Sequence, residues 1–145
     1  MGEQASLELK QLLAERRLFK ARISSMMISK ELASAEDDLK DAQDSLKQRK
    51  FKWATIQGYY STFHSARALL YSSGFRERSH YAVLIAMREL FANKLGKDLI
   101  RRFGDAMDLQ QEADYSSEFS EGGATETIEG AEKFLKKTKE ILKIK

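Results

Sequence analysis

None of the 145 residues is a proline, and this absence constrains the fold more than any other feature of the sequence. At the usual proline share of about 5%, a chain of this length would hold roughly seven. Proline ends helices because its ring removes an amide donor and clashes with the preceding turn. A chain without proline therefore favours helices joined by short turns that contain glycine or serine.

Apolar residues recur at the helical period in six segments, whereas no segment shows the alternation typical of a strand. The expected helices cover residues 4–23, 30–49, 53–73, 80–95, 98–115 and 125–144. The segment 53–73 is apolar over most of its circumference, which predicts a central helix. Because the connections are short, we predict an all-α fold, an up-and-down antiparallel bundle of four to five helices with an extra N-terminal helix.

Serine and glycine mark the expected helix ends. Ser29 and Ser79 stand where an N-cap hydroxyl would accept a bond from an amide of the first turn. Gly74 and Gly96 stand where helices would end, because glycine adopts the left-handed conformation at little cost. The segment 116–124, which contains a pair of glycines, is predicted to be a loop.

The composition excludes several classes of chemistry. The chain has no cysteine and two histidines, which excludes disulfides, cysteine-ligated zinc, iron–sulfur clusters and thiol catalysis. We therefore expect no metal and no cofactor. Residues 1–6 lack the basic start of an export signal, and the longest uncharged run, 53–66, is shorter than the roughly 20 apolar residues that span a bilayer. The sequence thus predicts a cytoplasmic protein with no membrane contact.

The formal net charge of +3 hides a strong segregation of charge. Residues 104–129 carry eight acidic side chains and no Lys or Arg, whereas 76–102 and 131–145 each carry a net +4. Such segregation is typical of a nucleic-acid surface or of an interface between acidic and basic proteins. The alternative is that these charged side chains only form the solvent-exposed faces of helices. The acidic run 36–38 is likewise expected to lie on an exposed helix face.

Two constellations could carry chemistry. Tyr60, His64 and Arg67 lie at i, i+4 and i+7 of one predicted helix and so share a face, where His and Arg could bind phosphate or transfer a proton. The alternative is a histidine that belongs to the core. Around the predicted cap at Ser79, the side chains that could form an anion site with the helix amides are Arg76, Arg78 and His80.

For the second constellation, the alternative is that the two arginines pair with the acidic segment 104–129. Elsewhere the sequence contains no glycine-rich phosphate loop, no serine-nucleophile motif and no His-containing metal pair.

The order of the motifs resembles that of the HEPN domain (higher eukaryotes and prokaryotes nucleotide-binding), in its small stand-alone prokaryotic branch. The residues that carry the resemblance are 35–44, 59–70, Gly74, 79–80, 113–115 and 131–135. The resemblance covers about 28–142, so we expect residues 28–145 to form the HEPN-like domain and 1–27 to form an N-terminal helical extension.

The resemblance implies a homodimer, often encoded beside a minimal nucleotidyltransferase, with many such pairs acting as toxin and antitoxin. The resemblance also implies a catalytic motif, because catalytic HEPN members are metal-independent ribonucleases that use an Arg and a His with four to six residues between them. Neither His64 nor His80 follows an arginine at that spacing, and Gln110 stands where related members have an arginine. Residues 113–115 match the Ala-Asp-Tyr triplet of the family, and the resemblance implies that Asp114 and Tyr115 contribute to a polar cleft or a dimer contact.

These observations favour a non-catalytic HEPN-like domain that binds a nucleotide, RNA or a nucleotidyltransferase-type partner. The candidate anion contacts are Arg67, Arg76, Arg78 and His80, and Tyr60 is grouped with the cleft or dimer contacts. One alternative is a metal-independent endoribonuclease with a rearranged site built from His64, Arg67 and His80. The other is a purely structural dimeric interaction module.

Overall fold

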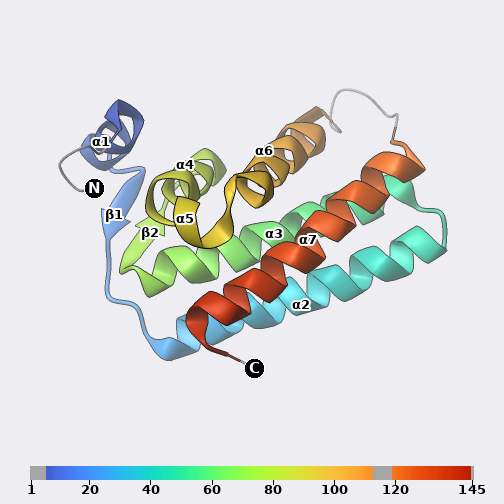
Figure 1. The fold of residues 1–145 in the computed structure, drawn as a ribbon, viewed down its shortest axis with the longest axis horizontal. Coiled ribbons are helices and arrows are strands. Elements are labelled where there is room, and N and C mark those ends of the chain that lie inside the picture. The colour runs from blue at the N-terminus through green and yellow to red at the C-terminus, as the bar shows by residue number, and fades with distance from the viewer. Residues whose placement is uncertain (1–5, 113–118, 145) are drawn as a thin grey trace.

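The computed structural model describes residues 6–112 and 119–144 and shows a helical bundle (Figure 1). Successive long helices, α2, α3, α6 and α7, run in alternating directions, which confirms the predicted up-and-down bundle. Within the described residues the elements are α1 (Leu7–Ala14), β1 (Leu18–Lys20), α2 (Ser25–Lys47), α3 (Phe51–Ser72), β2 (Phe75–Glu77), α4 (His80–Leu90), α5 (Ala92–Leu95), α6 (Lys97–Glu112) and α7 (Glu121–Leu142).

Helix α3 lies at the centre, as its apolar circumference predicts, and contacts α2, α4, α6 and α7. Its side chains Tyr59, Leu69 and Leu70 are fully buried. Gly58 lets α7 approach closely, because a Cβ there would lie 3.0 Å from Thr127 Cγ2. These contacts make α3 the element against which the rest of the fold is positioned.

Two helices begin four or five residues earlier than predicted. Helix α2 is capped by Ser24, whose hydroxyl accepts a bond from Met27 N at 3.2 Å, so the predicted cap at Ser29 is wrong. Helix α7 is capped by Ser120, whose hydroxyl accepts from Gly123 N at 2.9 Å. The two glycines of the predicted loop thus lie in the first turn of α7, because this cap satisfies an amide there.

A small antiparallel sheet replaces part of the predicted first helix and a predicted loop. Helix α1 ends at Ala14, Arg16 has a φ of 58°, and the chain continues into β1. The register pairs Leu18 with Glu77 and Phe19 with Arg76. The paired segments are far apart in sequence, so no local pattern in either one signals the pairing.

The region after α3 follows the predicted turns more closely. Gly74 and Gly96 have φ values of 85° and 90°, the left-handed region that favours glycine. Ser79 caps α4 by accepting a bond from Ala82 N at 3.1 Å. The single helix expected over 80–95 is divided into α4 and α5 at Phe91.

The N-terminal elements share the main core. Leu9, Leu12 and Leu18 belong to the same buried cluster as Phe63 and Val83. Figure 1 shows α1, β1 and β2 together at one end of the bundle. In the described part of the chain, every helix is too short or too polar to cross a membrane.

Candidate functional site

A cluster of charged side chains lies between α3, α2 and β2; we call Glu31, Asp38, His64, Arg67 and Glu77 the charge cluster. Arg67 Nη1 donates to Glu31 Oε1 at 2.9 Å, and its Nε donates to Glu77 Oε2 at 2.9 Å. The side chains of Glu31 and Glu77 are only 11% and 4% exposed. Arg67 therefore lies between two largely buried carboxylates and is not an open cation.

His64 is held in the same way. Its Nδ1 lies 3.1 Å from Glu31 Oε2 and its Nε2 lies 3.6 Å from Asp38 Oδ2. Both ring nitrogens thus face carboxylates from α2. The acidic run 36–38 was predicted to be an exposed face, and Asp38 departs from that reading because its side chain is only 29% exposed.

The electrostatics agree with this geometry. Burial alone would raise the pKa of Glu31, but the bonds from His64 and Arg67 outweigh burial and lower it. Burial disfavours the Arg67 cation, but Glu77 and Glu31 outweigh that effect and raise its pKa. Each buried charge is thus maintained by its partner, as buried ion pairs require.

His80 has a different environment. Its ring stacks on Phe63, with the centroids 4.1 Å apart, and its Nδ1 lies 2.8 Å from the Tyr59 hydroxyl. Burial raises the pKa of Tyr59, so the phenol stays protonated beside His80. Burial, with the charge of Arg67, lowers the pKa of His80, which favours the neutral ring.

The three candidate catalytic residues therefore surround one aromatic ring. The centroid of the Phe63 ring lies 5.7 Å from that of His64, 4.1 Å from that of His80 and 5.0 Å from the Arg67 guanidinium carbon. The centroid of the Tyr60 ring lies 6.5 Å from that of His64 and 6.1 Å from that of His80. Two of these three candidates, His64 and Arg67, already face carboxylates.

Arg76 in β2 and Arg78 directly after it are exposed on the outer side of the sheet, because side chains alternate along a strand and Glu77 points inward to Arg67. The Arg76 guanidinium carbon lies 5.6 Å from the Tyr71 ring, and that of Arg78 lies 4.9 Å from the Phe19 ring. Across residues 6–112 and 119–144, neither guanidinium reaches a carboxylate within ion-pair distance.

The described part of the acidic segment 104–129 pairs elsewhere. Asp105 pairs with Arg101 at 2.9 Å, and Glu121 lies 3.7 Å from Arg49. The predicted alternative, in which this segment neutralises the arginines of β2 within the chain, therefore finds no contact in the described residues. Asp114 and Tyr115 lie outside the described residues.

The sequence did not identify two sets of residues near the candidate site: the carboxylates of α2 that face His64 and Arg67, and the residues of β1 that lie beside Arg76 and Arg78. Glu31 and Asp38 are seven residues apart on α2, a spacing that puts them on one helix face and could have linked them to His64. Arg17 and Phe19 carried no local signal, because only the long-range pairing of β1 with β2 brings them to Arg76 and Arg78.

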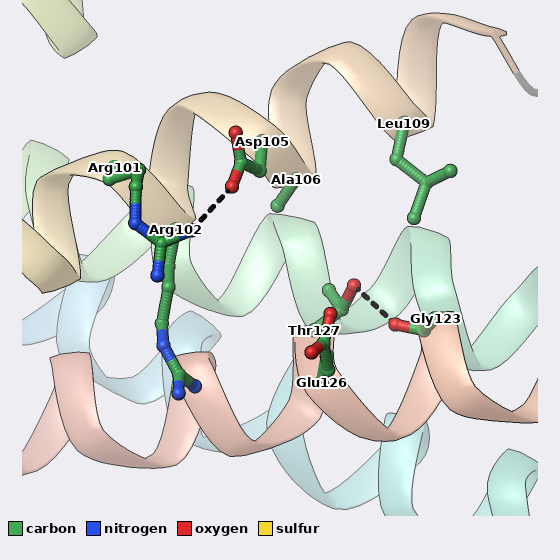
Figure 2. A pocket seen from close by; sticks show the side chains of 8 residues that line it. All are labelled: Arg101, Arg102, Asp105, Ala106, Leu109, Gly123, Glu126 and Thr127. Carbon is green, nitrogen blue, oxygen red and sulfur yellow. Dashed lines mark hydrogen bonds and ion pairs between the residues drawn. The ribbon is translucent and has the colours of Figure 1, made fainter.

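A hollow lies between α6 and α7, with a volume of about 100 Å³ (Figure 2). Figure 2 shows Arg101 and Arg102 beside Asp105 on α6, and Glu126 on α7. Arg102 Nε lies 3.1 Å from Asp98, and its buried Nη1 has no hydrogen-bond partner in the described residues. Both arginines pair with carboxylates of their own helix, so this hollow offers no excess of positive charge. The described residues also contain no group of His, Asp and Glu that could hold a metal ion.

Comparison with known proteins matches the greater part of this chain. The family model of the HEPN domain matches residues 28–145. A protein named Putative toxin MJ0605 from Methanocaldococcus jannaschii is 30% identical over 75% of this chain and 84% of its own length. A second protein of that organism, Putative toxin MJ0142, is 27% identical over 79% and 81% of the two chains.

A third relative, a UPF0332 protein from Archaeoglobus fulgidus, is 27% identical over 74% of this chain and 89% of its own length. The matched region contains most of α2 and all of α3 to α7, and with them the charge cluster, Arg76 and Arg78. The bundle, its central helix and the match over residues 28–145 agree, and the chain is a member of the HEPN domain family.

Proposed function

We propose that this HEPN protein is one component of a toxin–antitoxin-type pair and that it binds RNA or a nucleotide through phosphate groups where β2 meets α4. Arg76, Arg78 and His80 are the proposed contacts. The observation that carries the proposal is the pair of exposed arginines without a carboxylate partner in the described residues, directly before the capped N-terminus of α4. The relatives named as toxins support the wider role.

The chemistry of these side chains suits a phosphate. A guanidinium can donate two parallel bonds to phosphate oxygens, and the positive end of a helix dipole favours an anion nearby. Arg67, in contrast, already donates to two carboxylates. We assign Arg67 to holding β2 against α3 rather than to the ligand, and we assign His64 to the same internal contact.

Titration of the protein with ATP and with a short RNA at low salt tests the proposal. We expect binding that weakens by about tenfold or more in Arg76→Ala/Arg78→Ala, since the loss of one charge-assisted bond is worth roughly 1.5–3 kcal/mol. Arg88→Ala/Arg101→Ala, which removes two exposed arginines from α4 and α6, is the matched control and should bind like the wild type. A wild-type protein that binds neither probe contradicts the proposal.

The second candidate is a metal-independent endoribonuclease, which the arrangement of His64, Arg67 and His80 around Phe63 supports. Its test is RNA incubated in EDTA with wild-type protein or with His64→Ala/His80→Ala. Cleavage by the wild type alone would support the enzyme. An equal lack of cleavage in both samples would remove it.

The partners are proposals of the same kind. We expect a homodimer, and an antitoxin partner of the nucleotidyltransferase type. Sedimentation of the purified protein measures the first, and co-purification with the product of a neighbouring gene measures the second. A monomer over the accessible concentration range would contradict the dimer and would also remove the purely structural dimeric module.

A further inference from the structure

We infer that the outer face of the β1–β2 sheet binds single-stranded RNA, with Arg17, Phe19, Arg76 and Arg78 as its contacts; these four residues are called the sheet face. The inference rests on the proposed function and deepens it. It names an RNA with unpaired bases as the ligand and adds contacts from β1.

The register places the residues of the sheet face together. Phe19 is paired with Arg76, and Arg78 N donates to Arg17 O at 2.7 Å, which continues the pairing by one residue. Alternation along the strands turns Leu18 and Glu77 to the inner side, where Leu18 is 1% exposed. The inner ion pair between Glu77 and Arg67 attaches the sheet to α3 and leaves the outer side chains to solvent.

Aromatic rings support the two arginines of this face. Arg78 lies over Phe19 and Arg76 lies near Tyr71, with guanidinium carbons 4.9 and 5.6 Å from the ring centroids. A guanidinium held against a ring keeps its other planar side available. Unstacked bases of RNA stack on arginine planes and on aromatic rings, while the guanidinium edges donate to phosphates.

The charge around the sheet face complements a polyanion. The exposed cations on and beside the two strands are Arg16, Arg17, Lys20, Arg22, Arg76 and Arg78. Of the nearby carboxylates, Glu15 lies 3.3 Å from Arg17, and Glu77 lies beneath the sheet with Arg67. The excess of positive charge predicts binding that weakens as salt rises.

The combination of planar and charged groups points to unpaired bases. A duplex keeps its bases stacked on one another, so it offers phosphates but no base face to this surface. Arg17 and Phe19 also precede residue 28, where the match to the family model begins. Half of the sheet face is therefore contributed by this chain outside the region that it shares with the HEPN family model.

The experiment compares the full chain binding to a short single-stranded RNA with its binding to the duplex of the same sequence, by fluorescence anisotropy. We expect tighter binding of the single strand. Phe19→Ala should weaken single-strand binding by about tenfold, because base stacking is worth roughly 1–3 kcal/mol. Arg78→Lys keeps the charge but loses the planar group, so it should weaken single-strand binding while leaving the salt dependence unchanged.

Trp53→Ala is the matched control, because Trp53 is 53% exposed and lies beside Lys52 in a similar pair at the other end of α3. It should bind like the wild type. Thermal melting identifies any variant that fails to fold. Arg78→Lys changes only an exposed side chain, so it keeps the test decisive if Phe19→Ala unfolds.

Two results would overturn the inference: wild-type binding of the single strand by both Phe19→Ala and Arg78→Lys, or a duplex bound as tightly as the single strand. If Arg76→Ala/Arg78→Ala loses binding while both Phe19→Ala and Arg78→Lys keep it, the proposed function stands and the sheet face alone is rejected. If the wild type binds no RNA and no ATP, the proposed function itself fails.

Discussion

Arg67 is the residue on which the charge cluster depends. Its side chain is 28% exposed, yet it pairs with Glu31 and Glu77, whose side chains are only 11% and 4% exposed. Removal of one member of a buried ion pair leaves the other charge unpaired in a medium that solvates it poorly. Loss of Arg67 should therefore destabilise this part of the molecule strongly, although the intact ion pairs contribute little net stability.

We predict that Arg67→Met lowers the free energy of unfolding by about 3 kcal/mol, the low end of the range for a broken buried pair because the guanidinium is partly exposed. Arg67→Met/Glu77→Gln should recover part of the loss, since one of the stranded charges is then absent. Urea denaturation measures both. Arg101→Ala, at an exposed pair on α6, is the control and should change stability little. A stable single variant would contradict the role assigned to Arg67.

His80 gives the protein a pH dependence of known sign. Its pKa in the folded protein lies below 6.5 because burial and the nearby Arg67 and His64 disfavour the charged ring, while Glu77 acts in the opposite direction. The unfolded chain therefore binds more protons, and stability must rise with pH in this range. The contribution is fully present above pH 6.5 and is lost as the pH falls through the folded-state pKa.

We therefore predict that the wild-type free energy of unfolding falls as the pH is lowered below 6.5, and that His80→Asn reduces this slope. Denaturant titrations at a series of pH values measure the effect. His64→Asn serves as the comparison, since His64 faces carboxylates and His80 faces a phenol. An unchanged slope in His80→Asn would show that another group causes the dependence.

At the scale of elements, the fold depends on how closely α7 approaches α3. Gly58 sits where a Cβ would lie 3.0 Å from Thr127 Cγ2 and 3.6 Å from the backbone nitrogen of Ile128. Such a contact forces a shift of the neighbouring helix, because packed interiors have little space to yield. The same addition at Gly122, in the first turn of α7, meets no atom within 4 Å.

We predict that Gly58→Ala destabilises the protein by about 1–2 kcal/mol, since overpacking of about 1–3 kcal/mol exceeds the gain in helix propensity. Gly122→Ala, the control, should be neutral or stabilising by up to about 1 kcal/mol. In Gly58→Ala/Thr127→Ser the obstructing methyl is absent but the hydroxyl that donates to Gly123 O remains, so stability should recover. A lack of recovery would mean that the close approach of the helices has another cause.

At the scale of the whole molecule, the N-terminal elements are part of the packing. We propose that residues 28–145 form the HEPN domain and that 1–27 extend it. Leu18 is 1% exposed and lies in the main core cluster. We predict that Leu18→Ala lowers the free energy of unfolding by about 2–5 kcal/mol, as is usual for a buried leucine.

Leu7→Ala is the control, because Leu7 is 83% exposed and should matter little. Thermal and urea unfolding measure the two variants. A deletion of residues 1–23 should leave a helical protein that melts at a lower temperature. If Leu18→Ala unfolds like the wild type, the N-terminal segment does not contribute to the core as its burial indicates.

Much of the bundle could be predicted from the sequence, because helix formation leaves local signals. The apolar stripe of α3, the cap at Ser79 and the glycines at positions 74 and 96 are all local features, and the structure has them where they were expected. The start of α2 was predicted wrongly, because Ser24 and Ser29 are both capable caps and the choice between them depends on packing beyond the first turn.

The sequence by itself determined a helical bundle, its central helix and the HEPN family, since periodicity, caps and motif order are written along the chain. Only the tertiary structure decided which charges are open and which are paired. Arg67 and Arg76 look alike as residues, but one donates to two carboxylates from α2 and β2 and the other lies on the outer side of the sheet. That difference depends on Glu31 and Glu77 reaching Arg67 on α3 and on β1 pairing with β2. These contacts join segments far apart in the sequence, so they leave no local pattern from which to predict them.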